Sequence, residues 1–493
     1  MSPNQTSPTR VVLTAGDAEL SRADEAIGRL GMPARGIEVT DPGTEEVIAR
    51  VPDASREDIT ASMESADRAG TAWARTTPRE RSNVLHRWWE LLVEHAEELA
   101  LVITREMGKT LAEAKGEVKY GSDFVRWYAE EAVRAGGNFQ EAPDGGSRIL
   151  TRRSPVGLAV LITPWNFPLA MATRKIAPAL AAGCSAVLKP ATATPLTAYY
   201  AVQLARQAGV PEDLVQVLTT SSSRVMSETA LLDPHARKVS FTGSTEVGRT
   251  LLGLASERVL RTSMELGGNA PALVFDDADL DRAAEGVMAA KLRNGGQSCI
   301  AANRIYVQDG IADAFVEALG EKFAGVRLGH GLAADAQLGP LINAQAVSDM
   351  ERLVEGAVTE GAELRVGGRT AGESGNYFEA TVLDRVPAEA DIARSEIFGP
   401  IAAIQRFSTE EEAIRRANDT EFGLAGYVFT ESLDRAFRVA DAIQCGLVGI
   451  NQGVPSNAAA PFGGVKQSGL GREGGAEGLE EYQNIRFYNI ASR

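Results

Sequence analysis

Short apolar runs alternate regularly with segments of helical pattern between residues 155 and 256. The runs are GLAVLITP, CSAVLKP, LVQVLTT and KVSFTGS. After each of them, apolar residues recur every three or four positions, which predicts a helix. Strand and helix alternating in this order is typical of a parallel sheet covered by helices on both faces. We therefore expect an α/β fold whose ligands bind at the carboxyl ends of the strands.

The alternation restarts near residue 268, which predicts a second α/β unit. Residues 54–134 carry apolar positions at helical spacing and should form helices that precede the first sheet. Two strand-like segments remain outside both sheets, one around residues 136–155 and the other, YQNIRFYNIA, near the C-terminus. They pair either with each other or with another subunit.

Composition excludes several classes of function. The 493 residues carry 66 acidic and 50 basic side chains, a formal net charge of −16, and no basic stripe that would indicate nucleic-acid binding. No stretch is long and apolar enough for a membrane span. Three scattered cysteines form no disulfide framework and favour the cytoplasm. The four histidines stand at no metal-ligand spacing, so we expect no metal.

Small or polar residues follow three of the four strands at their carboxyl ends. A glycine and a serine at the start of a helix allow backbone N–H groups to approach a phosphate. The spacing differs from the G-x-G-x-x-G fingerprint of ordinary dinucleotide folds, and any one of these segments alone is equally consistent with a routine turn. The residues at these turns are Trp165, Asn166, Lys189, Pro190, Ala191, Thr192, Gly243 and Ser244.

Glu265 and Cys299 are candidates for chemistry beside such a sheet. Most cysteines of this kind are small buried hydrophobic residues, and a lone glutamate is more often a surface residue. A thiol with a pKa of about 8.5 needs help to ionise, and a nearby carboxylate raises that pKa. Glu265 is therefore better suited to activating water than to activating Cys299. Spacing alone permits this pair without establishing it.

Six motifs in this order resemble those of the aldehyde dehydrogenase superfamily: TPWNFP, SFTGSTEVG, MELGGNAP, GGQSC, EIFGP and PFGGVKQSGLGREG. The resemblance runs from about residue 35 to the end. It implies two doubly wound parallel-sheet domains plus a small β oligomerisation extension, in a homodimer or homotetramer. The implied ranges are 1–135 and 156–266 for the dinucleotide-binding domain, 267–467 for the catalytic domain, and 136–155 and 468–493 for the extension.

The resemblance also implies roles for individual residues. Cys299 attacks the aldehyde carbon to give a thiohemiacetal, whose oxyanion is held by the Asn166 side-chain amide and the Cys299 backbone N–H. Hydride transfer to the nicotinamide leaves a thioester, which Glu265 hydrolyses through an activated water. Glu473 matches a carboxylate that relays protons. The implied cofactor-binding positions are Trp165, Asn166, Lys189, Pro190, Ala191, Thr192, Gly243, Ser244, Leu266, Glu396 and Phe398.

The segments MATRK, KLRNGGQSC and GVPSN resemble those of NADP-linked succinate-semialdehyde dehydrogenases. The likeness implies that Arg174, Arg293 and Ser456 bind the distal carboxylate of the substrate, a task that suits the bidentate guanidinium. Without the likeness, both arginines would be assigned to surface or interdomain salt bridges. The alternative substrates are another acid semialdehyde, such as glutarate semialdehyde, and a broader range of aldehydes. A CoA-acylating reaction is disfavoured because Glu265 would hydrolyse the thioester.

Thr192 bears on the choice of cofactor. NAD-preferring members of the superfamily often have a glutamate here, whose charge would repel a 2′-phosphate. A neutral threonine beside Lys189 removes that repulsion and leaves a cation within reach. We therefore expect NADP to be preferred and NAD to remain possible.

Overall fold

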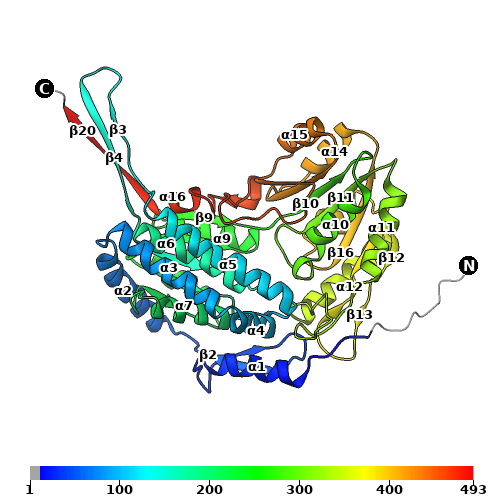
Figure 1. The fold of residues 1–493 in the computed structure, drawn as a ribbon, viewed down its shortest axis with the longest axis horizontal. Helices are drawn as coiled ribbons and strands as arrows, with labels where there is room; N and C mark the ends of the chain where they lie inside the picture. The colour runs from blue at the N-terminus through cyan, green and yellow to red at the C-terminus, as the bar shows by residue number, and fades with distance from the viewer. Residues whose placement is uncertain (1–10, 492–493) are drawn as a thin grey trace, which may run out of the picture.

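The computed structural model describes residues 11–491 as two halves, each built on a mostly parallel sheet. A third, small sheet projects from one side of the first half (Figure 1). The predicted ranges 1–135 and 468–493 include residues 1–10 and 492–493, which lie outside the described part of the chain.

The first half contains a six-stranded sheet in the order β19-β9-β8-β5-β6-β7. Neighbouring strands run parallel except β19, which pairs antiparallel with β9. The strands are β5 (Leu158–Ile162), β6 (Ala186–Lys189), β7 (Val215–Val217), β8 (Ala236–Thr242), β9 (Arg261–Glu265) and β19 (Gly469–Leu470). The helices between them are α6 (Pro168–Ala182), α7 (Leu196–Gln207), α8 (Ser223–Leu232) and α9 (Thr245–Ser256). The predicted alternation of β5 to α9 is confirmed.

Two strands of this sheet, β9 and β19, were not predicted from the sequence. β9 has the sequence RTSME, which contains no apolar run, and it is held by its ladder to β8. The predicted extension, 468–493, is wrong at its start, because Gly469 and Leu470 pair with Glu265 and Met264 in the first sheet. A two-residue strand in a glycine-rich segment has no pattern of its own, so tertiary pairing alone defines it.

The N-terminal segment is mostly helical, as predicted for residues 54–134. The elements are α1 (Asp17–Gly28), the hairpin β1 (Ile37–Thr40) and β2 (Val47–Val51), α2 (Arg56–Trp73), α3 (Pro78–Glu94), α4 (Ala96–Met107) and α5 (Leu111–Glu131). Ser55, Thr77 and Thr110 start α2, α3 and α5 with complete capping boxes. Trp88 of α3 is fully buried, and its ring N–H donates to the carbonyl of Ala201 in α7.

The second half contains a seven-stranded sheet in the order β12-β15-β16-β11-β10-β17-β18, parallel except at β12. Its strands are β10 (Ala270–Val274), β11 (Ala302–Gln308), β12 (Glu363–Val366), β15 (Thr381–Asp384), β16 (Ile401–Phe407), β17 (Ala425–Phe429) and β18 (Leu447–Ile450). Its longer helices are α10 (Leu280–Leu292), α11 (Ala312–Ala324), α12 (Ala344–Thr359), α14 (Glu410–Asn418) and α15 (Leu433–Ala442). Shorter elements are η1 (Arg293–Gly296), β13 (Thr370–Ala371), β14 (Tyr377–Phe378), α13 (Asp391–Arg394) and η2 (Lys466–Ser468). The short helix α16 (Glu477–Glu480) lies against α6 of the first half instead.

The projecting sheet consists of β3 (Phe139–Glu141), β4 (Ser147–Pro155) and β20 (Gln483–Ala491). β20 pairs along its whole length with β4, so the two strand-like segments outside the main sheets do pair with each other. Ile485 and Phe487 of β20 expose most of their side-chain surface.

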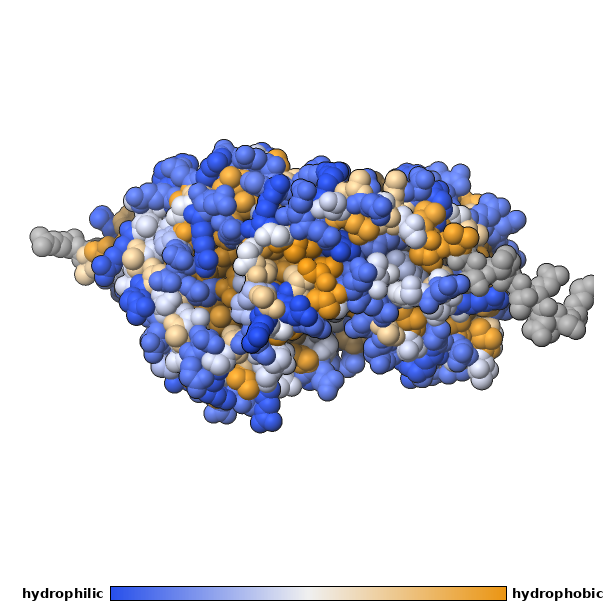
Figure 2. Space-filling model, turned by 90° about the horizontal axis from the view of Figure 1, so that it is seen from below, coloured by the Kyte–Doolittle hydropathy of each residue, from blue (hydrophilic) through white to orange (hydrophobic). Residues whose placement is uncertain are grey.

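The molecular surface agrees with the composition. The face seen in Figure 2 is mostly hydrophilic, with apolar residues gathered in separate patches. Within residues 11–491, no helix combines the length and the apolar character that crossing a membrane requires.

Replacing Trp88 by Ala should lower the free energy of unfolding by about 3–5 kcal/mol, because it empties a buried site and removes the bond to Ala201. Urea denaturation followed by circular dichroism measures the change. Trp89, half-buried against Arg126, provides the matched control. A loss for Trp89→Ala as large as that for Trp88→Ala would contradict the assignment of Trp88 to the core.

Candidate active site

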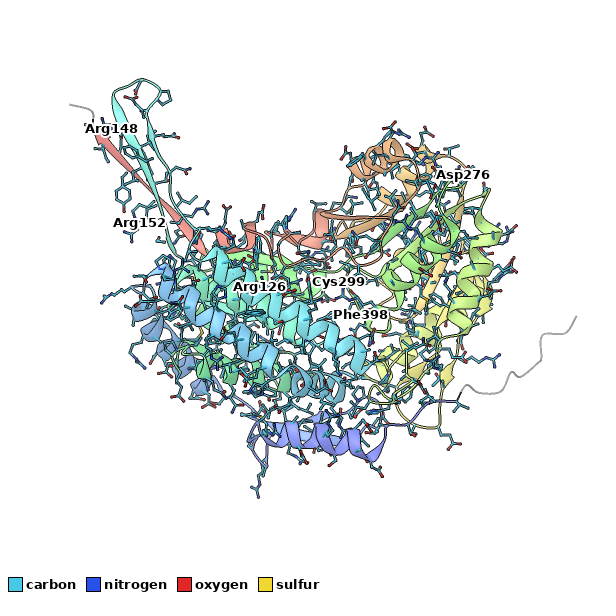
Figure 3. All side chains as sticks on the ribbon, in the orientation of Figure 1. Arg126, Arg148, Arg152, Asp276, Cys299 and Phe398 are labelled. Carbon is cyan, nitrogen blue, oxygen red and sulfur yellow. The ribbon has the colours of Figure 1, made fainter. Side chains whose placement is uncertain are left out.

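Cys299 lies between the two halves of the molecule, where the chain leaves η1 and approaches β11 (Figure 3). The preceding turn requires unusual backbone angles: Asn294 has φ of 57° and Gly296 has φ of +74°. A side chain at Gly296 would overlap the carbonyl oxygen of Gly399. Glycine is therefore needed here, because the loop packs backbone against backbone.

Asn166, at the carboxyl end of β5, reaches this loop. Its Nδ2 donates to the carbonyl of Gln297 at 3.0 Å, two residues before Cys299. Asn294 Nδ2 donates to the same carbonyl at 3.1 Å. An amide Nδ2 carries two hydrogens, and this bond uses one of them. The second N–H of Asn166 remains for an oxygen that develops negative charge near Cys299.

Glu265, the last residue of β9, is the carboxylate that faces Cys299. Burial raises the pKa of Glu265, and the nearby Arg174 guanidinium opposes that shift. Burial raises the pKa of Cys299 well above its usual value, and the negative charge of the Glu265 carboxylate adds to this shift. At rest Cys299 is therefore a thiol. A side chain at Gly268 would overlap the Cys299 carbonyl, so this glycine allows the close approach.

Arg174 of α6 contacts two carboxylates of the protein, whereas the sequence predicted contact with the carboxylate of the substrate. Its Nε lies 2.5 Å from Glu473, and its Nη2 lies 3.5 Å from Glu265. The guanidinium also stacks 4.5 Å from the ring centre of Phe462. Nη1 is buried without a hydrogen-bond partner. The salt-bridge interpretation thus describes the Arg174 contacts.

Glu473 joins α6 to the C-terminal segment. It forms ion pairs with both Arg174 and Lys175, and Lys175 Nζ also donates to Ser240 of β8 at 2.9 Å. All four side chains are nearly inaccessible to solvent. Burial raises the pKa of a carboxyl, but the two cations outweigh it and lower the pKa of Glu473.

A cavity of about 450 Å³ opens beside Arg293 and Ser456, and its walls include Tyr120 and Phe167. The Arg293 guanidinium lies 4.8 Å from the ring centre of Phe167 and 5.7 Å from that of Tyr120. No carboxylate lies within ion-pair distance of Arg293 in the part of the chain that the structure describes. Arg174 is not part of this wall, so the structure brings together two of the three predicted substrate residues.

A larger cleft, of about 980 Å³, lies along the carboxyl edge of the first sheet. Predicted cofactor residues in its wall are Trp165, Lys189, Ala191, Thr192, Gly243 and Ser244. Ser244 caps α9, so the amino end of that helix opens into the cleft. Burial lowers the pKa of Lys189, and no carboxylate within residues 11–491 offsets this effect. A buried, unpaired cation suits a phosphate-bearing ligand.

Other residues of this wall were missed by the sequence analysis. Val247, Thr250, Leu251 and Leu254 form one face of α9 at helical spacing and line the cleft. Val247 exposes 47% of its surface, so the helix turns an apolar face toward empty space. The i, i+3, i+4, i+7 pattern was available as a signal, but it is equally typical of a core-facing helix.

Glu396 and Phe398 extend the site from the second half. Glu396 Oε1 accepts the N–H of Gly268 at 3.2 Å, and burial raises its pKa to about 7. Phe398 has φ of 48° and meets Trp165 edge to face, with ring centres 5.5 Å apart. Strained backbone of this kind persists where packing enforces it. Pro190 and Leu266 lie outside the wall of the cleft, and Leu266 packs against Gly248.

Comparisons with known proteins agree with this geometry. The model of the Aldehyde dehydrogenase family matches residues 31–488. The chain is 51% identical to the succinate-semialdehyde dehydrogenase of Paenarthrobacter nicotinovorans, over 90% of this chain and 99% of that protein. It is 47% identical to the glutarate-semialdehyde dehydrogenase of Pseudomonas putida, over 96% of this chain and 99% of that protein.

Solved structures give the same result. An NADP-dependent enzyme of E. coli superposes with a TM-score of 0.91 at 45% sequence identity, covering 93% of this chain and 95% of that one. The predicted α/β fold of the superfamily is thereby confirmed. The chain belongs to the aldehyde dehydrogenase family.

Proposed function

We propose that the protein oxidises succinate semialdehyde to succinate, with NADP as the preferred acceptor. The observation that carries the choice of substrate is Arg293, a cation without a carboxylate partner among residues 11–491, in the wall of a cavity of about 450 Å³. Arginine binds carboxylates through paired N–H donors. Ser456 in the same wall adds a hydroxyl, and Arg174 Nη1 is a buried donor still unpaired. The related succinate-semialdehyde dehydrogenase supports the same choice.

The residues around Cys299 act in different steps of the proposed reaction. The partly exposed Cys299 thiol loses its proton to water, and the sulfur then attacks the aldehyde carbon to form a thiohemiacetal. The free N–H of Asn166 and the Cys299 backbone N–H stabilise the resulting oxyanion. Bound NADP supplies the hydride acceptor. Glu265 then activates the water that hydrolyses the Cys299 thioester.

The cofactor residues fit NADP. Lys189 provides a buried cation for the 2′-phosphate, and Thr192 in the same wall adds no negative charge. Glu396 from the second half is positioned by Gly268 to hold the nicotinamide end, with Phe398 and Trp165 beside it.

Glutarate semialdehyde is the alternative substrate, because a related enzyme bears that name and one methylene changes binding by only about 1–3 kcal/mol. We also propose a homodimer or homotetramer that assembles through the sheet of β3, β4 and β20, whose exposed apolar residues favour contact. The three free cysteines favour the cytoplasm.

Arg293→Ala should raise the KM for succinate semialdehyde at least about tenfold, because a hydrogen bond to a charged group contributes about 1.5–3 kcal/mol. The KM for propanal, which has no carboxylate, should not change. Lys119→Ala, at an exposed cation in the same wall, is the matched control. Steady-state assays compare both variants with the wild-type protein. Equal losses on both aldehydes would contradict a carboxylate-binding role.

Glu265→Gln should make Cys299 more reactive toward iodoacetamide in the cofactor-free enzyme. Removing the negative charge lowers the thiol pKa, and below that pKa the thiolate fraction rises about tenfold for each unit of decrease. Modification rates at pH 8 test this, with Cys299→Ala as the background from Cys184 and Cys445. The Glu265→Gln substitution should also abolish steady-state turnover. An unchanged modification rate would show that Glu265 does not control the thiol.

Thr192→Glu should lower kcat/KM for NADP relative to NAD by at least about tenfold, because a carboxylate opposite a 2′-phosphate costs several kcal/mol. Thr192→Val, which changes no charge, is the control. Parallel assays with both cofactors give the ratio. A wild-type kcat/KM for NAD well above that for NADP would refute the preference.

A further inference from the structure

A buried ion pair lies beside the active site and has no part in the reaction described above. Lys109 follows α4, and Glu117 lies on α5; each exposes 2% of its surface. Lys109 Nζ lies 2.6 Å from Glu117 Oε2. Burying two charges costs several kcal/mol per ion unless further hydrogen bonds satisfy them. The other hydrogen bonds of Lys109 and Glu117 indicate the role of this ion pair.

Glu117 caps a helix that does not carry its own cap. Phe167, at the start of α6, offers no side-chain acceptor. Glu117 Oε1 accepts the first free N–H groups of α6 instead, from Leu169 at 2.9 Å and Ala170 at 3.2 Å. A carboxylate at this end of a helix also interacts favourably with its dipole. One carboxylate therefore fixes the start of α6 and orients Lys109.

Lys109 fixes the residue just before that helix. Its Nζ donates to the backbone carbonyl of Asn166 at 2.8 Å. Asn294 Nδ2 donates to the same carbonyl at 3.0 Å. With the carbonyl held from two sides, the peptide of Asn166 has one orientation, and its side chain is directed toward the Gln297 carbonyl and the Cys299 loop.

We propose that Lys109 and Glu117 are positioning residues, which set the backbone of Asn166 and so aim its side-chain amide at the oxyanion formed on Cys299. This inference rests on the proposed role of Asn166. Lys109 and Glu117 need not touch the substrate to act in this way. Glu117 also neutralises Lys109, which leaves Arg293 as the cation that faces a substrate carboxylate.

A direct role for Lys109 in substrate binding is the competing interpretation. Lys109 lines the same cavity as Arg293, and its Nζ lies 4.0 Å from the ring centre of Phe167. A cation that binds substrate would affect KM, whereas a residue that aims an oxyanion donor affects kcat. The two interpretations therefore predict different kinetics for the same variant.

The test is a double-mutant cycle with Asn166. Lys109→Met should lower kcat about 10- to 100-fold with the KM for succinate semialdehyde within about twofold, since losing an oxyanion donor outright costs about 10²–10³-fold. Added to Asn166→Ala, it should lower kcat by less than about threefold more, because its effect passes through Asn166. Lys109→Arg, which keeps charge and donors, should recover most of kcat.

Two further variants keep the test decisive. The double variant Lys109→Met/Glu117→Gln removes the unpaired buried charge but keeps the acceptor for α6. If Lys109→Met alone folds poorly, this double variant should show the same kcat defect in its place. Lys238→Met is the matched control: Lys238 is equally buried but bonds to Ser263 and Glu481. The effects of Lys238→Met and Asn166→Ala on kcat should multiply, as the effects of independent sites do.

Multiplying effects of Lys109→Met and Asn166→Ala, or a tenfold rise in KM at unchanged kcat, would overturn the inference. Neither result would affect the proposed function, because the wild-type activity and the Asn166→Ala defect would remain. A wild-type protein that does not oxidise succinate semialdehyde, or an Asn166→Ala variant without a defect, would instead refute the proposed function.

Discussion

The ion pairs between Glu473 and the two cations of α6 hold the catalytic centre together. Glu265, Glu473, Arg174 and Lys175 are all buried, and two negative charges offset two positive ones. Such a cluster is stable only as a unit, because removing one member leaves a buried charge without compensation. It ties the end of β9, the middle of α6 and the C-terminal segment to one geometry. The position of the Glu265 carboxylate beside the thiol depends on that arrangement.

The proposed selectivity for an acidic aldehyde depends on which cations near the site already have acidic partners. Glu117 neutralises Lys109, and Glu473 together with Glu265 offsets the charges of Arg174 and Lys175. Arg293 has aromatic neighbours instead of an acidic one. Despite the net charge of −16, the wall of the proposed substrate cavity therefore keeps a partly buried cation that can attract an anion.

Local pattern predicted the sheets better than it predicted the site. The strands from β5 to β8 are apolar runs, so their alternation with helices could be predicted from the sequence. β9 and β19 lack such runs and exist through pairing. The partners of Arg174 are 91 and 299 positions away in the sequence, and no spacing rule reaches that far. Lys109 went unnoticed for the same reason, since the carbonyl that it binds belongs to a turn 57 residues later.

Glu473 also has a consequence for synthesis of the chain. It is the last of the site residues to be translated, and the strand that precedes it completes the edge of the first sheet. A nascent chain that has already produced Cys299, Glu265 and Arg174 still lacks the carboxylate that organises them. The ion-pair arrangement around Arg174 is therefore complete only after this final segment has been synthesised and has docked on α6.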